Sequence, residues 1–384
     1  MAPDKPRNVS TSVLVIGGCG FLGHHIVSQL LEPSTAKVSV LDLRTTHNRL
    51  PNCTYYDADI TSPTAVREIL QKAKPQIIIH TASPPVVNDG QSSAQRNGAK
   101  QLYYKVNVEG TRNLIEQAGE VGCVKAFVCT SSASVVHDTV SNLANADERW
   151  PILRAPLQRE YYSETKGKAE EIVLHANRKY GDMLTVALRP AGIFGEGDMQ
   201  FTPNLLKAYE KGQTKFQLGD NDNLFDTTYV GNVAYAHILA AVALMETHAL
   251  TTKPLDHEKV DGEAFFITNG QPVYFWDFVR MVWAEAGDKT EPGQVWVIGK
   301  DTGLMLASMG EWAFWLAGGW TPNLTRQKVK YSCMTRFYCI DKARRRLGYE
   351  PRGGVEEGVK RTVGWFRNGM VGRGGEEVVI VVII

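Results

Sequence analysis

Short runs of apolar, mostly β-branched residues recur along the first half of the chain, at 12–16, 37–41, 76–80, 126–130 and 184–188. These runs are continuous rather than alternating, which is typical of strands buried on both faces of a parallel sheet. Segments with apolar residues at helical spacing lie between them, near 23–31, 64–74, 108–120 and 164–180. This rhythm predicts an α/β protein with a doubly wound parallel sheet.

The pattern loosens after about residue 200, where we expect a helix, a strand and two further helices near 230–245, 264–267, 275–286 and 340–347. Residues 10–200, with returns from 225–270, are predicted to form the sheet domain. Residues 201–370 would mostly form a smaller mixed domain over the carboxyl edge of the sheet, where open α/β folds bind ligands. Residues 371–384 are left as a tail.

Composition excludes several classes of protein. The 384 residues are 43% hydrophobic and 22% charged, with a net charge of +1, so no basic field predicts nucleic-acid binding. The six cysteines form no Cys-x-x-Cys pair, and we expect no metal site and a reducing compartment. The polar N-terminus does not resemble a secretory signal, and no run of about 18 apolar residues predicts a membrane span.

A glycine-rich turn follows the first predicted strand and precedes a helix. Gly17, Gly20 and Gly23 have the spacing G-x-x-G-x-x-G, with Phe21 and Leu22 inside the turn. Such glycines permit a close approach of the backbone to a pyrophosphate, and the helix amino end favours its negative charge. We therefore predict a Rossmann domain that binds a dinucleotide; the alternative is a structural glycine turn.

Asp42 ends the second predicted strand, 19 residues after Gly23. A carboxylate there can accept hydrogen bonds from the adenosine ribose hydroxyls and would repel a 2′-phosphate, so it favours NAD over NADP. Arg44 leaves NADP open, because a guanidinium can bind that phosphate. An ordinary turn aspartate is the alternative.

Further strand ends offer weaker candidates for cofactor contacts. Asp59 and Ile60 are placed to meet the adenine, and Ala82 lies where the chain passes close to the cofactor. An ordinary strand end explains each of them equally well.

Two Tyr-x-x-x-Lys pairs occur, Tyr162 with Lys166 and Tyr338 with Lys342. On a helix this spacing puts both side chains on one face. The ammonium can lower the pKa of the phenol from about 10, and the phenolate can then take a proton from an alcohol while hydride leaves the carbon. Only Tyr162 follows a serine-rich strand end, at 129–135, where a hydroxyl group can polarise the reacting C–O bond. Tyr338 is expected to be a packed aromatic beside a helix start.

The glycine loop, together with the motifs at 130–132, 162–166 and 188–198, resembles the extended short-chain dehydrogenases/reductases. The 30 residues from Ser132 to Tyr162 and the segment 225–234 match the 3β-hydroxysteroid dehydrogenase branch. Segment 265–278 resembles that of fungal sterol-4α-carboxylate 3-dehydrogenases (decarboxylating). The resemblance covers roughly residues 12–367.

The resemblance implies a catalytic triad of Ser132, Tyr162 and Lys166, with cofactor contacts from Lys166, Asn107, Pro190 and Ile193. It implies NAD(P)-dependent oxidation of the 3β-hydroxyl group of a sterol or triterpenoid, with loss of a 4α-carboxyl group as carbon dioxide. The residues alone support only alcohol oxidation or its reverse.

Residues 304–320 are strongly apolar and contain Trp312 and Glu311. We expect either a buried helix over the substrate site or an interfacial helix that contacts a membrane, with Lys328 and Lys330 near lipid head groups. A sterol substrate favours contact with the cytosolic face of the endoplasmic reticulum, with a cytoplasmic location as the alternative. The apolar tail at 378–384 is too short to span a membrane, and a homodimer is a further expectation.

Three rival functions share part of this pattern. A nucleotide-sugar epimerase or dehydratase would need polar groups for a diphosphate, where this chain is rich in Trp and Phe. A dehydrogenase that tailors triterpenoid acids would use the same residues. A non-catalytic dinucleotide sensor would not need Ser132, Tyr162 and Lys166.

Overall fold

The computed structural model describes residues 11–32, 36–85, 93–316 and 324–372. Its largest element is a sheet of seven strands in the order β12-β7-β5-β4-β1-β2-β3, in which all neighbours are parallel. The strands are β1 (Ser12–Ile16), β2 (Lys37–Asp42), β3 (Thr54–Asp57), β4 (Ile77–His80), β5 (Ala126–Thr130), β7 (Leu184–Pro190) and β12 (Glu263–Ile267). The predicted doubly wound sheet is confirmed.

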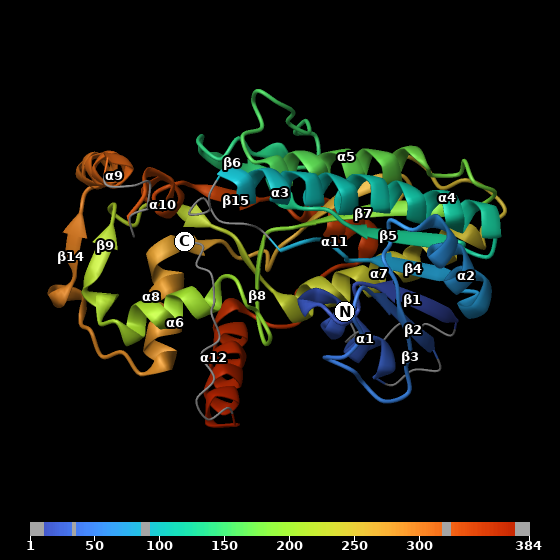
Figure 1. Ribbon diagram of the computed structural model, residues 1–384, viewed down its shortest axis with the longest axis horizontal. Helices are drawn as coiled ribbons and strands as arrows, with labels where there is room; N and C mark the ends of the chain where they lie inside the picture. The colour runs from blue at the N-terminus through green and yellow to red at the C-terminus, as the bar shows by residue number, and fades with distance from the viewer. Residues whose placement is uncertain (1–10, 33–35, 86–92, 317–323, 373–384) are drawn as a thin grey trace.

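Helices cover both faces of this sheet (Figure 1). On one face lie α3 (Ser93–Tyr103), α4 (Thr111–Val121) and α5 (Tyr161–His175); α2 (Pro63–Ala73) packs against α4. On the other face lie α1 (Phe21–Leu31) and α7 (Val230–His248), which pack against each other. Successive residues of β1 explain why its sequence is continuously apolar: Val13 and Val15 enter one core, and Leu14 and Ile16 enter the other.

Among the described residues, α7 is the one helix long and apolar enough to cross a membrane. Two thirds of that stretch is buried inside the protein, as in a core helix. Its burial against β5 and β7 therefore accounts for its apolar sequence.

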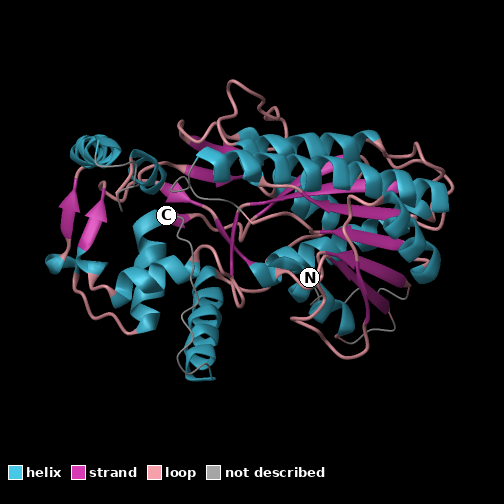
Figure 2. Ribbon diagram, in the orientation of Figure 1, coloured by secondary structure: helices cyan, strands magenta, loops and turns pink. Residues whose placement is uncertain are grey.

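A second region, built mostly from later residues, lies at one end of the molecule (Figure 2). It contains a sheet in the order β13-β10-β15-β6 and the strand pairs β8–β11 and β9–β14. These strands are β6 (Leu143–Ala146), β8 (Gly192–Phe194), β9 (Phe216–Leu218), β10 (Leu224–Phe225), β11 (Thr227–Tyr229), β13 (Val273–Tyr274), β14 (Trp296–Ile298) and β15 (Arg336–Tyr338). The helices of this region are α6 (Thr202–Glu210), α8 (Phe275–Ala286), α9 (Lys300–Leu316), α10 (Arg326–Ser332) and α12 (Val355–Gly372). Helix α11 (Asp341–Leu347) packs instead against β12 and α7 of the main sheet.

Two helices differ from their predicted form. The helix expected over 164–180 ends at His175, and Arg178 beyond it takes a left-handed conformation with φ of 61°. The helix expected over 108–120 begins as a π-helix, η1 (Tyr104–Gly110), which continues into α4. Hydrophobic spacing at the α-helical period does not predict a π-turn, because the extra residue of such a turn departs from that period.

The described part of segment 304–320 lies in α9, and it is not a buried helix. Met305, Met309 and Trp312 are 57%, 62% and 66% exposed, while Ala307 is buried. The expectation of a buried cover is therefore wrong for these residues. The end of that segment and the tail at 378–384 lie outside the described residues.

All six cysteines are free thiols in the structure. Cys19 and Cys129 are buried, and the other four are only partly so. No group of three or more potential metal ligands occurs among the residues that the structure describes.

Candidate active site

A cleft of about 2440 Å³ runs along the carboxyl ends of the central strands and into the second region. The glycine loop and Asp42 line one end, and Ser132, Tyr162 and Lys166 line its middle. Its far end is largely apolar, with walls from Phe201, Leu205, Phe225, Phe275, Trp276 and Val279. Because parallel strands end at the same edge, residues distant in sequence meet here.

The glycine loop requires glycine at two positions. Gly17 has a φ of +80°, and a Cβ there would lie 2.7 Å from the amide nitrogen of Ala82. A Cβ on Gly23 would lie 2.1 Å from the carbonyl oxygen of Gly17. The loop therefore packs against β4 and α1 as closely as a pyrophosphate cradle requires.

Asp42 connects the glycine loop to the end of β2. Its Oδ2 accepts a hydrogen bond from the amide of Cys19 (3.0 Å), and its Oδ1 accepts one from the amide of Leu43 (2.7 Å). Burial and the charge of Asp42 raise the pKa of the Cys19 thiol to about 11. The carboxylate is thus fixed beside the loop, and each oxygen keeps acceptor capacity for a ribose hydroxyl.

The weaker cofactor candidates divide into two groups. Asp59, Ile60, Ala82, Pro190 and Ile193 all line the cleft. Asn107 does not: it is buried in η1, where its Nδ2 donates to Thr165 Oγ1 (3.0 Å) and its Oδ1 accepts from Ser83 Oγ (3.0 Å). Its position fits a role in orienting α5.

Tyr162 lies in the first turn of α5, with its ring packed edge-on against Tyr103 at a centroid distance of 5.6 Å. Burial raises the pKa of its phenol above the usual value, while a hydrogen bond with Ser83 lowers it. That Lys166 lowers this pKa when the cofactor is bound stays a prediction.

Lys166 is directed toward the sheet. Its Nζ donates a 2.7 Å hydrogen bond to the main-chain oxygen of Thr130, and burial lowers its pKa. The Thr130 hydroxyl lies 2.7 Å from His237 Nε2, and His237 Nδ1 lies 2.8 Å from the carbonyl oxygen of Val233. Since a carbonyl only accepts, Nδ1 carries the proton and the Thr130 hydroxyl donates to Nε2.

Ser132 is connected to the helix of Tyr162 through other serines. Its Oγ lies 2.8 Å from Ser134 Oγ, to which Ser163 Oγ donates at 2.8 Å. These hydroxyls link the end of β5 to the first turn of α5.

A buried ion pair holds α5 against the sheet. Glu170 in α5 accepts from Arg189 in β7 at 2.6 Å, with side-chain exposures of 0% and 5%, and Ser131 Oγ donates to Glu170 at 2.5 Å. This network joins β5, β7 and α5 next to the cleft.

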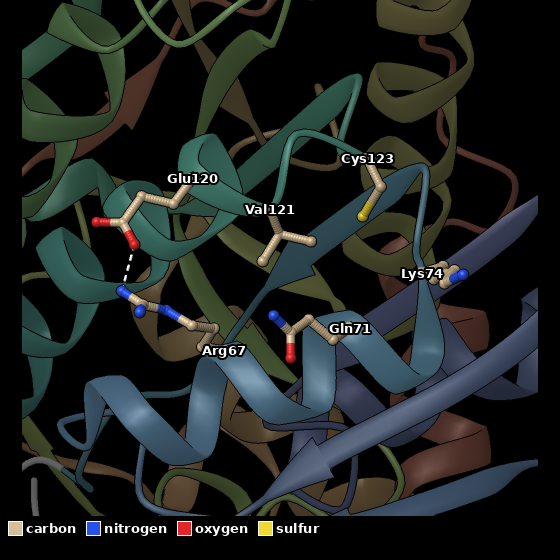
Figure 3. A pocket seen from close by; sticks show the side chains of 6 residues that line it. All are labelled: Arg67, Gln71, Lys74, Glu120, Val121 and Cys123. Atoms are coloured by element: carbon tan, nitrogen blue, oxygen red, sulfur yellow. Dashed lines mark hydrogen bonds and ion pairs between the residues drawn. The ribbon is translucent and has the colours of Figure 1, made fainter.

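A second hollow, of about 450 Å³, lies at the ends of α2 and α4 (Figure 3). Its lining consists of Arg67, Gln71, Lys74, Glu120, Val121 and Cys123. Arg67 and Glu120 point toward each other and form an ion pair, and Arg67 also donates to Gln117. Two of its charges, those of Arg67 and Glu120, already pair with each other, and none of the candidate site residues lies in it.

Tyr338 is confirmed as a packed aromatic. Its ring stacks on Phe266 at a centroid distance of 4.8 Å, just before α11 begins. Lys342 instead bonds to Glu263 and to the carbonyl oxygen of Ala264.

Some residues of the site were not found from the sequence. Contacts between distant segments bring four further residues into the site, and the spacing of residues along the sequence does not predict such contacts. They are Ser83, Ser134, Ser163 and His237. The polar end of β4 was the available signal for Ser83.

A glycine loop, an acidic end of β2 and a Tyr–Lys helix on a doubly wound sheet define an extended short-chain dehydrogenase/reductase. Residues 14–297 match the model of the 3-beta hydroxysteroid dehydrogenase/isomerase family. The chain therefore belongs to this family.

Its relatives support this assignment over nearly the whole chain. It is 40% identical to the sterol-4-alpha-carboxylate 3-dehydrogenase ERG26, decarboxylating, of Saccharomyces cerevisiae, which covers 94% of this chain and 99% of that protein. The human sterol-4-alpha-carboxylate 3-dehydrogenase, decarboxylating, is 33% identical to this chain. The alignment covers 94% of this chain and 90% of the human protein.

Solved structures show the same fold. The UDP-glucose 4-epimerase of Thermotoga maritima aligns with a TM-score of 0.66 and 22% identity, over 94% of this chain and 99% of that one. The structure of gox2253 aligns with a TM-score of 0.68 and 24% identity, over 94% and 98%.

Proposed function

We propose that this protein oxidises the 3β-hydroxyl group of a 4α-carboxysterol with NAD, and that the product loses its 4-carboxyl group as carbon dioxide. One observation carries the proposal: a single cleft joins the glycine loop and Asp42 to Tyr162, Lys166 and Ser132 and continues between apolar walls. The relatives named as decarboxylating sterol-4-alpha-carboxylate 3-dehydrogenases support the substrate class.

The residues present suit a dinucleotide. The tight backbone at Gly17 and Gly23 would hold the pyrophosphate, and the fixed carboxylate of Asp42 would hold the adenosine ribose. Asp59, Ile60 and Ala82 would lie along the adenosine half, and Pro190 and Ile193 along the nicotinamide half. When bound, the nicotinamide supplies the hydride acceptor.

The protein's own residues handle the proton of the alcohol. Tyr162 Oη, as phenolate, accepts the proton from the 3-hydroxyl group, and the Ser132 hydroxyl donates a hydrogen bond to the same oxygen. Lys166, anchored on Thr130, would bind the nicotinamide ribose and supply positive charge close to the phenol. The apolar walls would exclude water from the reacting carbon.

Loss of carbon dioxide then follows from the substrate. Oxidation gives a 3-ketone with a carboxylate on the neighbouring carbon; the bond to the carboxylate breaks, and its electron pair forms an enolate. The hydrogen bond from Ser132 and the proton on Tyr162 would stabilise the charge on the enolate oxygen. This sequence needs neither a metal ion nor a Schiff-base lysine.

A triterpenoid acid is the second candidate substrate, because the same apolar walls would accept it. A nucleotide sugar is disfavoured, because the named relatives are sterol dehydrogenases.

The exposed face of α9 supports peripheral contact with a membrane. Met305, Met309 and Trp312 are spaced so that they share one face, and all three are more than half exposed. Tryptophan and methionine on such a face suit the lipid interface, which is where a sterol resides. We therefore propose that the protein binds the cytosolic face of the endoplasmic reticulum; a homodimer stays a prediction.

Vesicle sedimentation tests this contact. Replacing Met309 and Trp312 by serine should reduce binding to neutral vesicles several-fold, whereas replacing the exposed Trp150 outside α9 should not. Equal binding by both variants would contradict it.

The enzymatic proposal is tested by incubating the protein with NAD and a 3β-hydroxy-4α-carboxysterol. Mass spectrometry should find a 3-ketosterol that lacks the carboxyl group, together with equimolar NADH. Absence of turnover with carboxylated sterols and triterpenoids alike would refute it.

A further inference from the structure

Arg336 places a cation in the apolar wall of the cleft. It begins β15, pairs with Phe225 of β10 and lines the cleft together with Ser132 and Tyr162. Its guanidinium carbon lies 4.9 Å from the ring centroid of Phe225 and 4.5 Å from that of Tyr331, and Nη2 donates to the Tyr331 hydroxyl. The two rings fix the position of the cation and partly offset its desolvation.

No carboxylate among the described residues forms an ion pair with Arg336. The nearby Asp226 has its pKa raised to about 7 by burial, and its Oδ2 accepts from the amide of Tyr338. Glu160 raises the pKa of Arg336 through its charge, and its Oε2 accepts from Ser163 Oγ. A guanidinium carries five N–H donors, and the hydrogen bond to Tyr331 uses one of those on Arg336.

Four of the other cations along the cleft differ from Arg336. Lys166 is engaged by Thr130, and Arg326 pairs with Glu311 at 2.6 Å. Arg159 and Lys105 are exposed, and Lys105 lies 3.7 Å from Asp59. Arg336 therefore differs from these four in two ways. Aromatic rings shield its guanidinium, and it forms no ion pair with a carboxylate of the described residues.

We propose that the guanidinium of Arg336 binds the carboxylate of the substrate and selects carboxylated over neutral 3β-hydroxy compounds. This inference rests on the proposed function and names the group behind its specificity. Arginine suits the task because its planar donors match the two oxygens of a carboxylate. Phe225 and the neighbouring aromatic residues would pack on the ring system that carries the acid.

The same contact has a consequence after oxidation. The carboxylate leaves as neutral carbon dioxide, and its electron pair passes to the enolate and finally to a C–H bond when a proton returns. Arg336 then faces a neutral ketone and loses its ionic partner. Product would therefore bind more weakly than substrate, which favours its release.

The test compares a 3β-hydroxy-4α-carboxysterol with its methyl ester, which has a similar shape and no charge. Wild-type protein should oxidise the acid with a kcat/KM about 10- to 100-fold above that of the ester, the range of a charged hydrogen bond. Arg336→Met should bring this ratio close to one by lowering the value for the acid, mainly through KM. Arg149→Met, a change at a 90% exposed arginine side chain, should leave the ratio unchanged.

Two further variants distinguish loss of the contact with the carboxylate from misfolding of the protein. Arg336→Lys keeps the charge and should restore part of the preference for the acid, and Tyr331→Phe should lower only the rate on the acid. Equal loss on acid and ester in these variants, or an unchanged ratio in Arg336→Met, would overturn the inference. A wild-type protein that oxidises both compounds equally would overturn it as well, whereas oxidation of neither would refute the proposed function itself.

Discussion

The Nζ atom of Lys166 lies 2.7 Å from the main-chain oxygen of Thr130, the last residue of β5. The ammonium is therefore held by the sheet, one helical turn from Tyr162. The His237 ring in turn fixes the Thr130 side chain from α7. Three elements together determine where the buried positive charge of the cleft lies.

Replacing Lys166 by Met should remove that charge while keeping the length of the side chain. We expect kcat/KM for the alcohol to fall by about 10²- to 10⁴-fold, the usual contribution of assisted proton transfer. Lys168→Met is the matched control, because Lys168 lies on the same helix and pairs with Glu164. Its activity should change less than about twofold, and similar losses in both variants would point to a defect of the helix.

Asp42 should set the preference for NAD over NADP. In Asp42→Ala the ratio of kcat/KM for NAD to that for NADP should fall by about tenfold or more, because a charged acceptor of the ribose hydroxyls is lost and repulsion of a 2′-phosphate ends. Asp57→Ala, at the paired position of β3, should keep the ratio. An unchanged ratio in Asp42→Ala would remove the carboxylate from this role.

The pKa of Tyr162 predicts the pH dependence of oxidation. Oxidation needs the phenolate, and burial holds the pKa above its usual value, so kcat/KM should rise with pH through the neutral and alkaline range. Ser83→Ala removes the hydrogen bond that lowers this pKa and should move the profile to higher pH. A rate independent of pH in the wild type would argue against a phenol that must lose its proton.

The buried pair of Glu170 and Arg189 predicts a strong effect on stability. Glu170→Ala leaves a buried guanidinium unpaired and should lower the free energy of unfolding by about 3–5 kcal/mol. Glu171→Ala, one residue away, removes a more exposed pair with Arg154 and should cost less than about 1 kcal/mol. Chemical denaturation of both variants measures the difference, and equal stabilities would contradict the role of the pair.

Much of the sheet could be predicted from the sequence, because strands buried on both faces leave continuous apolar runs. The run at 126–130 and the helix at 275–286 have their predicted bounds. The π-turn around Asn107 could not be predicted, because it is stabilised by contacts with Ser83 and Thr165 from other segments.

The candidate site was likewise only partly predictable from the sequence. Motifs located Gly17, Asp42 and Tyr162, because their spacing is local and tied to strand ends. Arg336 carried no such signal: its aromatic neighbours, Phe225 and Tyr331, come together only in the folded protein.

The most direct measurement is turnover of a 3β-hydroxy-4α-carboxysterol by Tyr162→Phe, with NAD affinity determined in parallel. Loss of one hydroxyl group should lower turnover by at least about 10³-fold and leave NAD affinity within about threefold. Tyr338→Phe, in the other Tyr-x-x-x-Lys pair, should retain turnover. Undiminished formation of NADH and carbon dioxide by Tyr162→Phe would show that another group accepts the proton.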